Sequence, residues 1–272
     1  MSHLHLQRAL YLALYDEGFA LEMRADPEGV LAPLGLEERE RVQLVAVDPR
    51  AFRTDPLRRR RALRILAEEY KAATTLAMAE TRSPSIVEGF FASRRFRRAV
   101  VDGDSFAPAF GEYLLGAVEE GRLSTPHLGD VTRLELAGSR ARRGAGRARP
   151  GVALAPGTEV VRVDGGTLET IQQVERWLFE LGLMPQVALC DDRPTLPPLP
   201  ARGQKPPACY LVTATQLVEV DEDLYRVLAI LAEPRPRSDA AAALGQAVPN
   251  ARVEDLLTSL IDDGLVAETS HD

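Results

Sequence analysis

Apolar residues in the first half of the chain recur at intervals of three and four, which is the period of an amphipathic α-helix. Two predicted helical faces show the pattern: Leu6, Leu10 and Leu14 in one, and Leu63, Leu66, Tyr70 and Ala73 in the other. The period continues to about Arg142, so this region is predicted to be a succession of helices.

Several boundaries in this region pair a side-chain acceptor with a following proline, a combination that favours the first turn of a helix. The pairs are Asp48-Pro49, Asp55-Pro56, Ser83-Pro84 and Thr125-Pro126. Most of the aromatic residues gather in the second half of the region, and at helical spacing such residues usually form a core. These predicted core residues are Phe90, Phe91, Phe96, Phe106, Phe110 and Tyr113.

The helical pattern fails near residue 140, because Ser139 to Pro150 consists almost entirely of Arg, Gly and Ala. We interpret residues 139–150 as a flexible basic linker that ends a helical domain at residue 138. An α/β region is expected over 151–272, starting with a strand at Thr158 to Val163 and a helix at Thr167 to Leu181. The prolines within 191–207 exclude helix and central strand there.

The last part, from about residue 208 to residue 272, has the most readable pattern. Tyr210 to Thr215 and Leu217 to Val220 are predicted strands, and three short helices follow. Those helices are expected at Asp221 to Leu231, from Ser238 to near Gly245, and at Arg252 to Asp262. Gly264 ends the last one before a short strand at 265–267. A hairpin followed by three short helices is typical of a winged helix. The predicted fold class is α+β, mostly α: an N-terminal helical domain followed by a small winged-helix-like C-terminal module.

Composition narrows the function classes. The 272 residues are 45% hydrophobic and 27% charged with a net charge of −7, which argues against general nucleic-acid affinity. No apolar run approaches the roughly 20 residues of a membrane span, and the first residues lack the features of a signal peptide. A cytoplasmic protein is therefore expected. Cys190 and Cys209 lie in no CxxC motif, and no disulfide is expected in a reducing compartment.

The chain lacks recognisable catalytic or ligand-binding motifs. Its histidines have no Cys, Asp or Glu partner at metal-ligand spacing: His3, His5, His127 and His271. The acid pairs Asp191-Asp192 and Asp262-Asp263 are interpreted as solvated charge. No GxGxxG, P-loop or GxSxG motif is present. The sequence thus predicts no metal, no organic cofactor and no enzymatic activity of its own.

Arginine clusters are the remaining conspicuous feature. They lie at Arg58 to Arg61, at Arg94-Arg95 with Arg97-Arg98, and within 140–149. Helical spacing spreads Arg58 to Arg61 around the whole circumference, so not all of them can face one partner. Either these residues form solvated faces, or some of them pair with an acidic partner surface or an acidic peptide.

Two stretches of the chain resemble known families. The tail "LVEVDEDLYRVLAIL…DLLTSLIDDGLVAE" resembles the leader-peptide recognition element of systems that modify ribosomally made peptides, a small winged-helix fold. The helical half is similar to partner proteins of multinuclear non-haem iron oxidative enzymes, including those of methanobactin and thio-amino-acid pathways. That similarity rests on "DPLRRRRALRILAEEY", "SIVEGFFASRRFRRAV" and "SFAPAFGEYLLGAV".

The resemblance implies a non-catalytic partner that docks on a separate iron-dependent oxidative enzyme and presents a precursor peptide through its leader sequence. In such elements the leader adds as a strand to the hairpin edge and packs against the third helix. The implied peptide-binding residues are Leu217, Val218, Glu219 and Val220 on the edge, and Leu256, Leu257 and Leu260 on the helix. The alternative for each of these leucines is the core of a small module.

Two other functions compete with this one. A winged helix most often binds DNA, so a transcriptional regulator is the chief alternative. From Leu217 to the end, however, twelve acidic residues face four arginines, and Glu254 and Asp255 occupy the first turn of the third helix. Such a helix repels DNA. A helical scaffold without peptide specificity fits the N-terminal half equally well.

Overall fold

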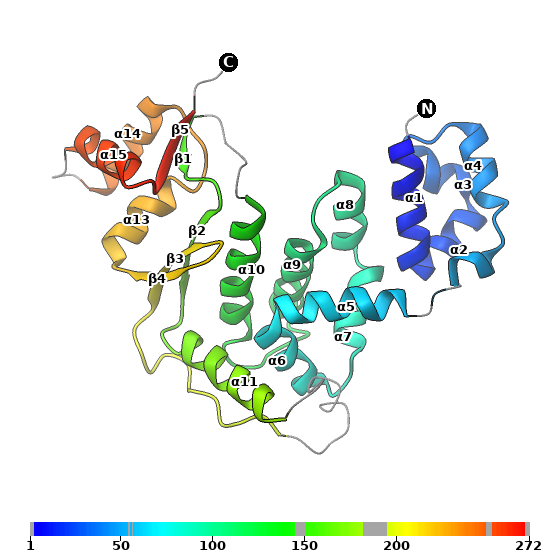
Figure 1. Cartoon of the computed structure of the whole chain (residues 1–272), viewed down its shortest axis with the longest axis horizontal. Coiled ribbons are helices and arrows are strands. Elements are labelled where there is room, and N and C mark those ends of the chain that lie inside the picture. Colours follow the sequence, from blue (N-terminus) through cyan, green and yellow to red (C-terminus); the bar gives the residue numbers. More distant parts are fainter. Residues whose placement is uncertain are drawn as a thin grey trace. The chain divides into compact units, whose positions relative to one another are not determined.

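The computed structural model describes residues 3–53, 55, 57–144, 151–181, 195–248 and 252–269 (Figure 1). The described residues are mostly helical, with a small amount of antiparallel sheet in the C-terminal half. This confirms the predicted fold class at that level. The chain divides into two compact units, the first of residues 1–125 and 177–196 and the second of residues 126–176 and 197–272.

The described part of the first unit is helical up to residue 119. Its longer helices are α1 (His3–Tyr15), α2 (Glu17–Ala25), α4 (Glu38–Val45), α5 (Arg58–Glu69), α6 (Lys71–Thr81), α8 (Arg94–Asp102) and α9 (Phe106–Glu119). Short turns of helix join them: α3 (Pro27–Leu31), η1 (Ala32–Leu34), η2 (Pro49–Arg53), α7 (Ser85–Glu88) and η3 (Gly89–Ala92). At the four predicted starts, a helix begins one to three residues after the acceptor of each pair.

Aromatic side chains form the centre of the first unit. Phe90, Phe91, Phe96 and Phe110 are fully buried. Their nearest ring centroids lie 5.2–5.5 Å apart in tilted or edge-to-face arrangements, the geometry that aromatic quadrupoles favour. The core prediction is confirmed for these four residues. Phe106 and Tyr113 contact the same rings but are only half-buried.

The described part of the second unit combines α10, most of α11, two small sheets and three C-terminal helices. The elements up to the second sheet are α10 (Leu128–Gly144), β1 (Gly151–Leu154), β2 (Thr158–Val163), α11 (Thr167–Leu181), β3 (Ala208–Thr213) and β4 (Leu217–Val220). The remaining elements are α13 (Glu222–Ile230), α14 (Arg237–Ala247), α15 (Val253–Asp262) and β5 (Val266–Thr269). The last residues of α11, from Trp177 on, belong to the first unit.

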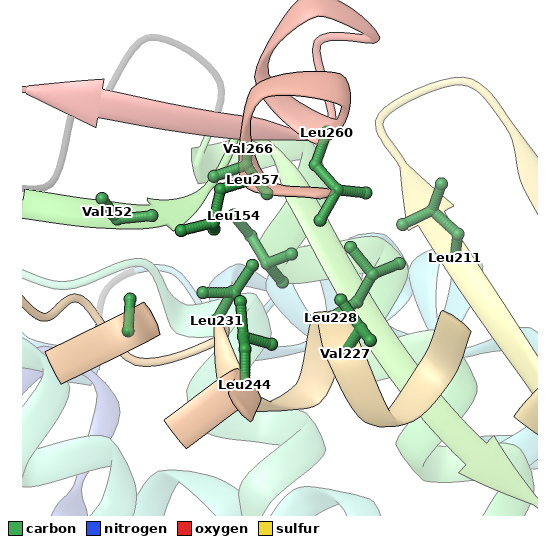
Figure 2. Packing of buried hydrophobic residues seen from close by; sticks show 11 residues of the cluster. Val152, Leu154, Leu211, Val227, Leu228, Leu231, Leu244, Leu257, Leu260 and Val266 are labelled. Carbon is green, nitrogen blue, oxygen red and sulfur yellow. The ribbon is translucent and has the colours of Figure 1, made fainter. Parts of the chain in front are cut away.

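The antiparallel sheet β2-β3-β4 is covered on both faces. On one face Tyr210 and Val212 pack with α10 residues Leu134, Ala137 and Ala141. On the other face Leu211 joins a cluster built mainly by α13, α14 and α15 (Figure 2). A strand covered on both faces reads as a continuous apolar run, which explains the unbroken burial of residues 209–212 on β3.

The core of the C-terminal module also uses residues from far upstream. Strand β1 pairs with β5 along its whole length, and an isolated bridge joins Val152 to Arg235. Val152 and Leu154 consequently lie in the same cluster as the leucines of α13 and α15 (Figure 2). The module is therefore larger than residues 208–272, the extent expected from its local pattern.

The predicted linker at 139–150 is wrong in its first half. Helix α10 continues to Gly144, and Ser139 and Ala141 are buried. Alanine and arginine favour helix, and Ala141 continues the buried spacing of Leu134 and Ala137. No helix of the described residues therefore ends at residue 138, and α10 belongs to the second unit. Residues 145–150 lie outside the described residues.

The proline-rich segment is also described only in part. Residues 195–207 contain no helix or strand, as predicted, whereas residues 191–194 lie outside the described residues. None of the helices in the described ranges is both long enough and apolar enough to cross a membrane.

Candidate functional site

Strand β4 is an edge strand. It pairs with β3 on one side, and among the described residues no strand pairs with its other side. The register places Leu217 opposite Val212 and Val220 opposite Cys209. An open edge presents unpaired backbone groups that accept a further strand.

The hairpin geometry identifies which backbone groups face that open side. The Thr213 amide donates to the Gln216 carbonyl at 2.9 Å, so these residues form a hydrogen-bonded pair at the turn. Bonded and non-bonded pairs alternate along an antiparallel ladder. Leu217 and Glu219 therefore direct their N–H and C=O groups away from β3, whereas Val218 bonds to β3.

The side chains of β4 point to two faces. Leu217 and Glu219 lie on the face of Tyr210 and Val212, and Val218 and Val220 lie on the other face. Val220 packs against the helical cluster. Leu217 and Val218 remain 40% and 45% exposed. The edge thus combines free backbone groups with an exposed apolar residue on each face.

The predicted residues on α15 differ from those on β4. Leu257 and Leu260 are 0% and 4% exposed and lie among Leu154, Leu228 and Val266 (Figure 2). They belong to the core, which was the alternative to a peptide-binding role for these leucines. Leu256 is half-buried against the same cluster. The structure therefore leaves the β4 residues, with Leu256, as the accessible part of the predicted site.

Acidic residues dominate the charge around this site. Every arginine between Leu217 and Thr269 lies within 4 Å of a carboxylate: Arg226, Arg235, Arg237 and Arg252. Arg237 is the most tightly held, with Glu254 at 2.8 Å and Glu268 at 2.6 Å. The exposed Glu219 has no ion pair among the described residues. Each arginine in the described part of the C-terminal region thus has a carboxylate neighbour, and acidic residues outnumber the arginines there.

One cysteine, Cys209, lies on β3 next to the edge strand. Cys209 pairs with Val220 across the ladder, is buried and is a free cysteine. Burial raises the pKa of the Cys209 thiol, and the neighbouring Glu222 carboxylate, 3.4 Å away, raises it further. A raised pKa keeps the thiol protonated at neutral pH. Cys190 lies outside the described residues.

One polar cluster of the second unit, around His127 and Asp164, was not predicted from the sequence. His127 is 1% exposed with a backbone φ of +63°, and its Nε2 donates to the Pro200 carbonyl at 2.9 Å. Its Nδ1 lies 3.5 Å from Asp164 Oδ1. Hydrogen bonds from the Gly166 and Gly203 amides, together with His127 and Arg202, outweigh burial and lower the pKa of Asp164. No local spacing links residues so distant in the chain.

The hydrogen bonds of this cluster stabilise the contact between two segments, and they leave His127 unsuited to act as a catalytic base. Because Nε2 is occupied by Pro200 and the ring is buried, His127 has no nitrogen open to a substrate. Arg202 adds a second tie, to Asp130 at 3.0 Å. These bonds hold residues 200–203 close to Asp164 and to the start of α10. Within the described residues, no three His, Cys, Asp or Glu side chains lie close enough together to hold a metal ion.

Comparison of the chain with known family models, with curated proteins and with solved structures gives no match in any of the three.

Proposed function

We propose that this protein is a non-catalytic partner that presents a ribosomally made precursor peptide to a separate iron-dependent oxidative enzyme. The leader of the peptide would add as a strand to β4. One observation carries the proposal: β4 is an open edge with two exposed apolar side chains, Leu217 and Val218. Natural edge strands are usually blunted by charge, proline or a covering loop.

The order of elements supports the same proposal. A three-stranded antiparallel sheet, β2-β3-β4, precedes three helices, α13, α14 and α15. This order is consistent with a winged-helix-like recognition module of the kind that the C-terminal sequence resembles. We include Leu256 as a contact for the peptide and remove Leu257 and Leu260, which the core needs.

The edge supplies modest affinity and clear directionality. Leu217 and Glu219 offer two donors and two acceptors, and each backbone hydrogen bond contributes about 0.5–1.5 kcal/mol net. Covering Leu217 and Val218 adds an apolar term. Ordering a peptide offsets much of this gain. Specificity would then come from the peptide side chains beside Leu217, Val218 and Leu256.

Docking on the oxidative enzyme is assigned to the helical unit. Four of its phenylalanines do not provide the interface, because Phe90, Phe91, Phe96 and Phe110 are fully buried. The exposed large apolar residues of this unit lie instead on α1, α2, α4 and α5, directly before α5, and at the end of α11: Leu4, Tyr11, Leu21, Val42, Leu57, Ile65, Phe179 and Leu181. Of these, Leu57 and Ile65 are closest to the arginine-rich start of α5.

Charge favours a peptide over DNA as the ligand of the C-terminal module. Glu254 and Asp255 are exposed in the first turn of α15, and the arginines nearby are paired with carboxylates. Binding to DNA depends on cations that neutralise phosphates. Tight DNA binding by the full chain, with no affinity for a co-encoded peptide, would instead support the regulator.

A proline scan of β4 tests strand addition. Glu219→Pro removes a donor that faces the open side, and edge strands tolerate proline at such positions. Glu219→Thr is the matched control because it removes the charge but keeps the amide. We expect the proline variant to lose affinity for the co-encoded precursor peptide, measured by calorimetry, while the threonine variant retains it.

The melting temperatures of both variants show whether the module has survived. Equal peptide affinity of two folded variants would contradict strand addition at β4. Val218→Pro is unsuitable for this test, because the Val218 amide bonds to β3 and its loss damages the hairpin itself.

A further inference from the structure

The first unit contains a cavity that the proposed peptide site does not use. It measures about 480 Å³ and is formed by α1, α2, η2 and α5, with Glu88 of α7 at its wall. This volume falls within the range of small-molecule sites. The apolar part of its lining consists of Ala13, Leu14, Ala20, Leu21, Phe52 and Leu63. Leu21 is 65% exposed, so an apolar surface remains uncovered there.

Three arginines at this cavity are less closely paired with carboxylates than Arg64 and Arg97 of the same unit. Arg53 and Arg59 share the Glu17 carboxylate at 3.9 and 3.6 Å. Arg60 is exposed and has no ion pair among the described residues. By contrast, Arg97 contacts Asp16 at 2.7 Å and Arg64 contacts Glu68 at 2.9 Å. The longer distances exceed those of charge-assisted hydrogen bonds, so guanidinium donors at the cavity remain available.

The other charged groups that line the cavity do not bind these free guanidinium donors. Arg24 donates to the carbonyls of Val45 and Val47, at the end of α4. The Asp55 carboxylate is already bound by Arg61, which does not line the cavity. Glu17 and Glu88 are the remaining carboxylates in the lining. Arg53, Arg59 and Arg60 therefore face only these two.

We propose that this cavity binds a small amphipathic organic anion, a carboxylate attached to an aliphatic or aromatic body. The body would cover Leu21, Phe52 and Leu63, and the carboxylate would pair with Arg59 and Arg60. Arg59 is positioned for this role because its guanidinium lies over the Phe91 ring, 5.6 Å from the centroid. Planar guanidinium groups bind carboxylates through two parallel hydrogen bonds. This site is independent of the peptide edge on β4.

Octanoate is the probe. Two simpler compounds, each with one of its two features, are the controls. Calorimetric titration of the full chain with octanoate is expected to show saturable binding at one site. Acetate carries the charge without the body, and 1-octanol carries the body without the charge, so each should bind at least about tenfold more weakly. Equal binding of octanol and octanoate would overturn the role of the arginines.

Two variants on α5 test the location. Arg60→Glu should weaken octanoate about three- to tenfold, whereas Arg64→Glu, on the same helix but outside the cavity, should change it less than twofold. Ala20→Phe fills the cavity and should abolish binding. Unchanged affinity in folded Ala20→Phe would overturn the proposal. If Ala20→Phe does not fold, equal effects of the two arginine variants overturn it instead.

Discussion

Strand β4 and helix α15 both carry leucines, but the leucine on β4 is exposed and two of those on α15 are buried. Leu257 on α15 is 0% exposed and is surrounded by the core of the module, whereas Leu217 on β4 is 40% exposed at an open edge. Both residues were predicted to bind the peptide, and the structure separates them. Leu257 is part of the core, and Leu217 is accessible at the surface. The comparison teaches that apolar character alone does not identify a binding residue.

Two glutamates differ in the same way, because one is bound within the protein and the other is not. The Glu80 carboxylate accepts hydrogen bonds from the amides and hydroxyls of Ser124 and Thr125 at 2.7–3.0 Å. Glu219, on the open edge, has no ion pair among the described residues. Glu80 stabilises the segment that follows α9, and Glu219 is available to a ligand.

The largest expected effect comes from Leu257→Ala. Removing a fully buried leucine loses its transfer free energy and leaves a cavity, so the free energy of unfolding should fall by roughly 2–5 kcal/mol. Urea unfolding measures this loss. The affinity of the folded fraction for the peptide should not change. Leu256→Ala, at the half-buried neighbour, is the control and should cost less stability. Lost affinity with full stability would place Leu257 back in the peptide site.

Replacing Glu80 is expected to have an intermediate effect on stability. Burial raises the pKa of this carboxyl, but the hydrogen bonds from Thr125 and Ser124 outweigh burial and hold the pKa below its ordinary value. Its stabilising contribution is therefore present above the unfolded pKa of about 4.3 and disappears as pH falls through the lower folded pKa.

Glu80→Gln should lower stability at pH 7 by about 1 kcal/mol, a value already reduced for solvent exposure. Thermal unfolding between pH 7 and pH 3 should show the difference from wild type shrinking as the pH falls. Glu219→Gln is the matched control and should leave stability within about 0.5 kcal/mol. A constant difference at every pH would contradict the role of the charged carboxylate.

The smallest effect on stability is expected for Leu217→Ala. A side chain at an open edge with few core contacts should change the free energy of unfolding by less than about 0.5 kcal/mol. Its affinity for the peptide should nevertheless fall about three- to tenfold, because apolar surface would no longer be covered on binding. A stability loss like that of Leu257→Ala, without lost affinity, would assign Leu217 to the core.

The sequence predicted those features that depend on neighbours in the chain. The spacing of Leu63 and Leu66 placed a helix correctly, because helical periodicity is local. The single helix predicted through Tyr70 and Ala73 is wrong, since α5 ends at Glu69 and α6 begins at Lys71. The two runs around Ala214 and Thr215 likewise gave β3 and β4 close to their observed bounds.

Features that depend on distant partners were not predictable in this way. The end of α10 looked like a linker, since only packing against β2 and β3 makes the burial of Ala141 favourable. Strand β1 was missed because its partner, β5, lies at the other end of the second unit. The exposure of Leu217 and the burial of Leu257 follow from tertiary packing, which an apolar pattern does not distinguish.

The pairing of β1 with β5 has a consequence for how the protein is made. Leu154 pairs with Val266, 112 positions later. At a synthesis rate of about 5–20 residues per second, β1 leaves the ribosome roughly 6–22 s before its partner exists. During that interval β1 is an unpaired strand of a nascent chain, exposed to aggregation and to chaperones. The second unit therefore completes its core only after residue 266 has been made, and a chain that stalls before residue 266 cannot complete it.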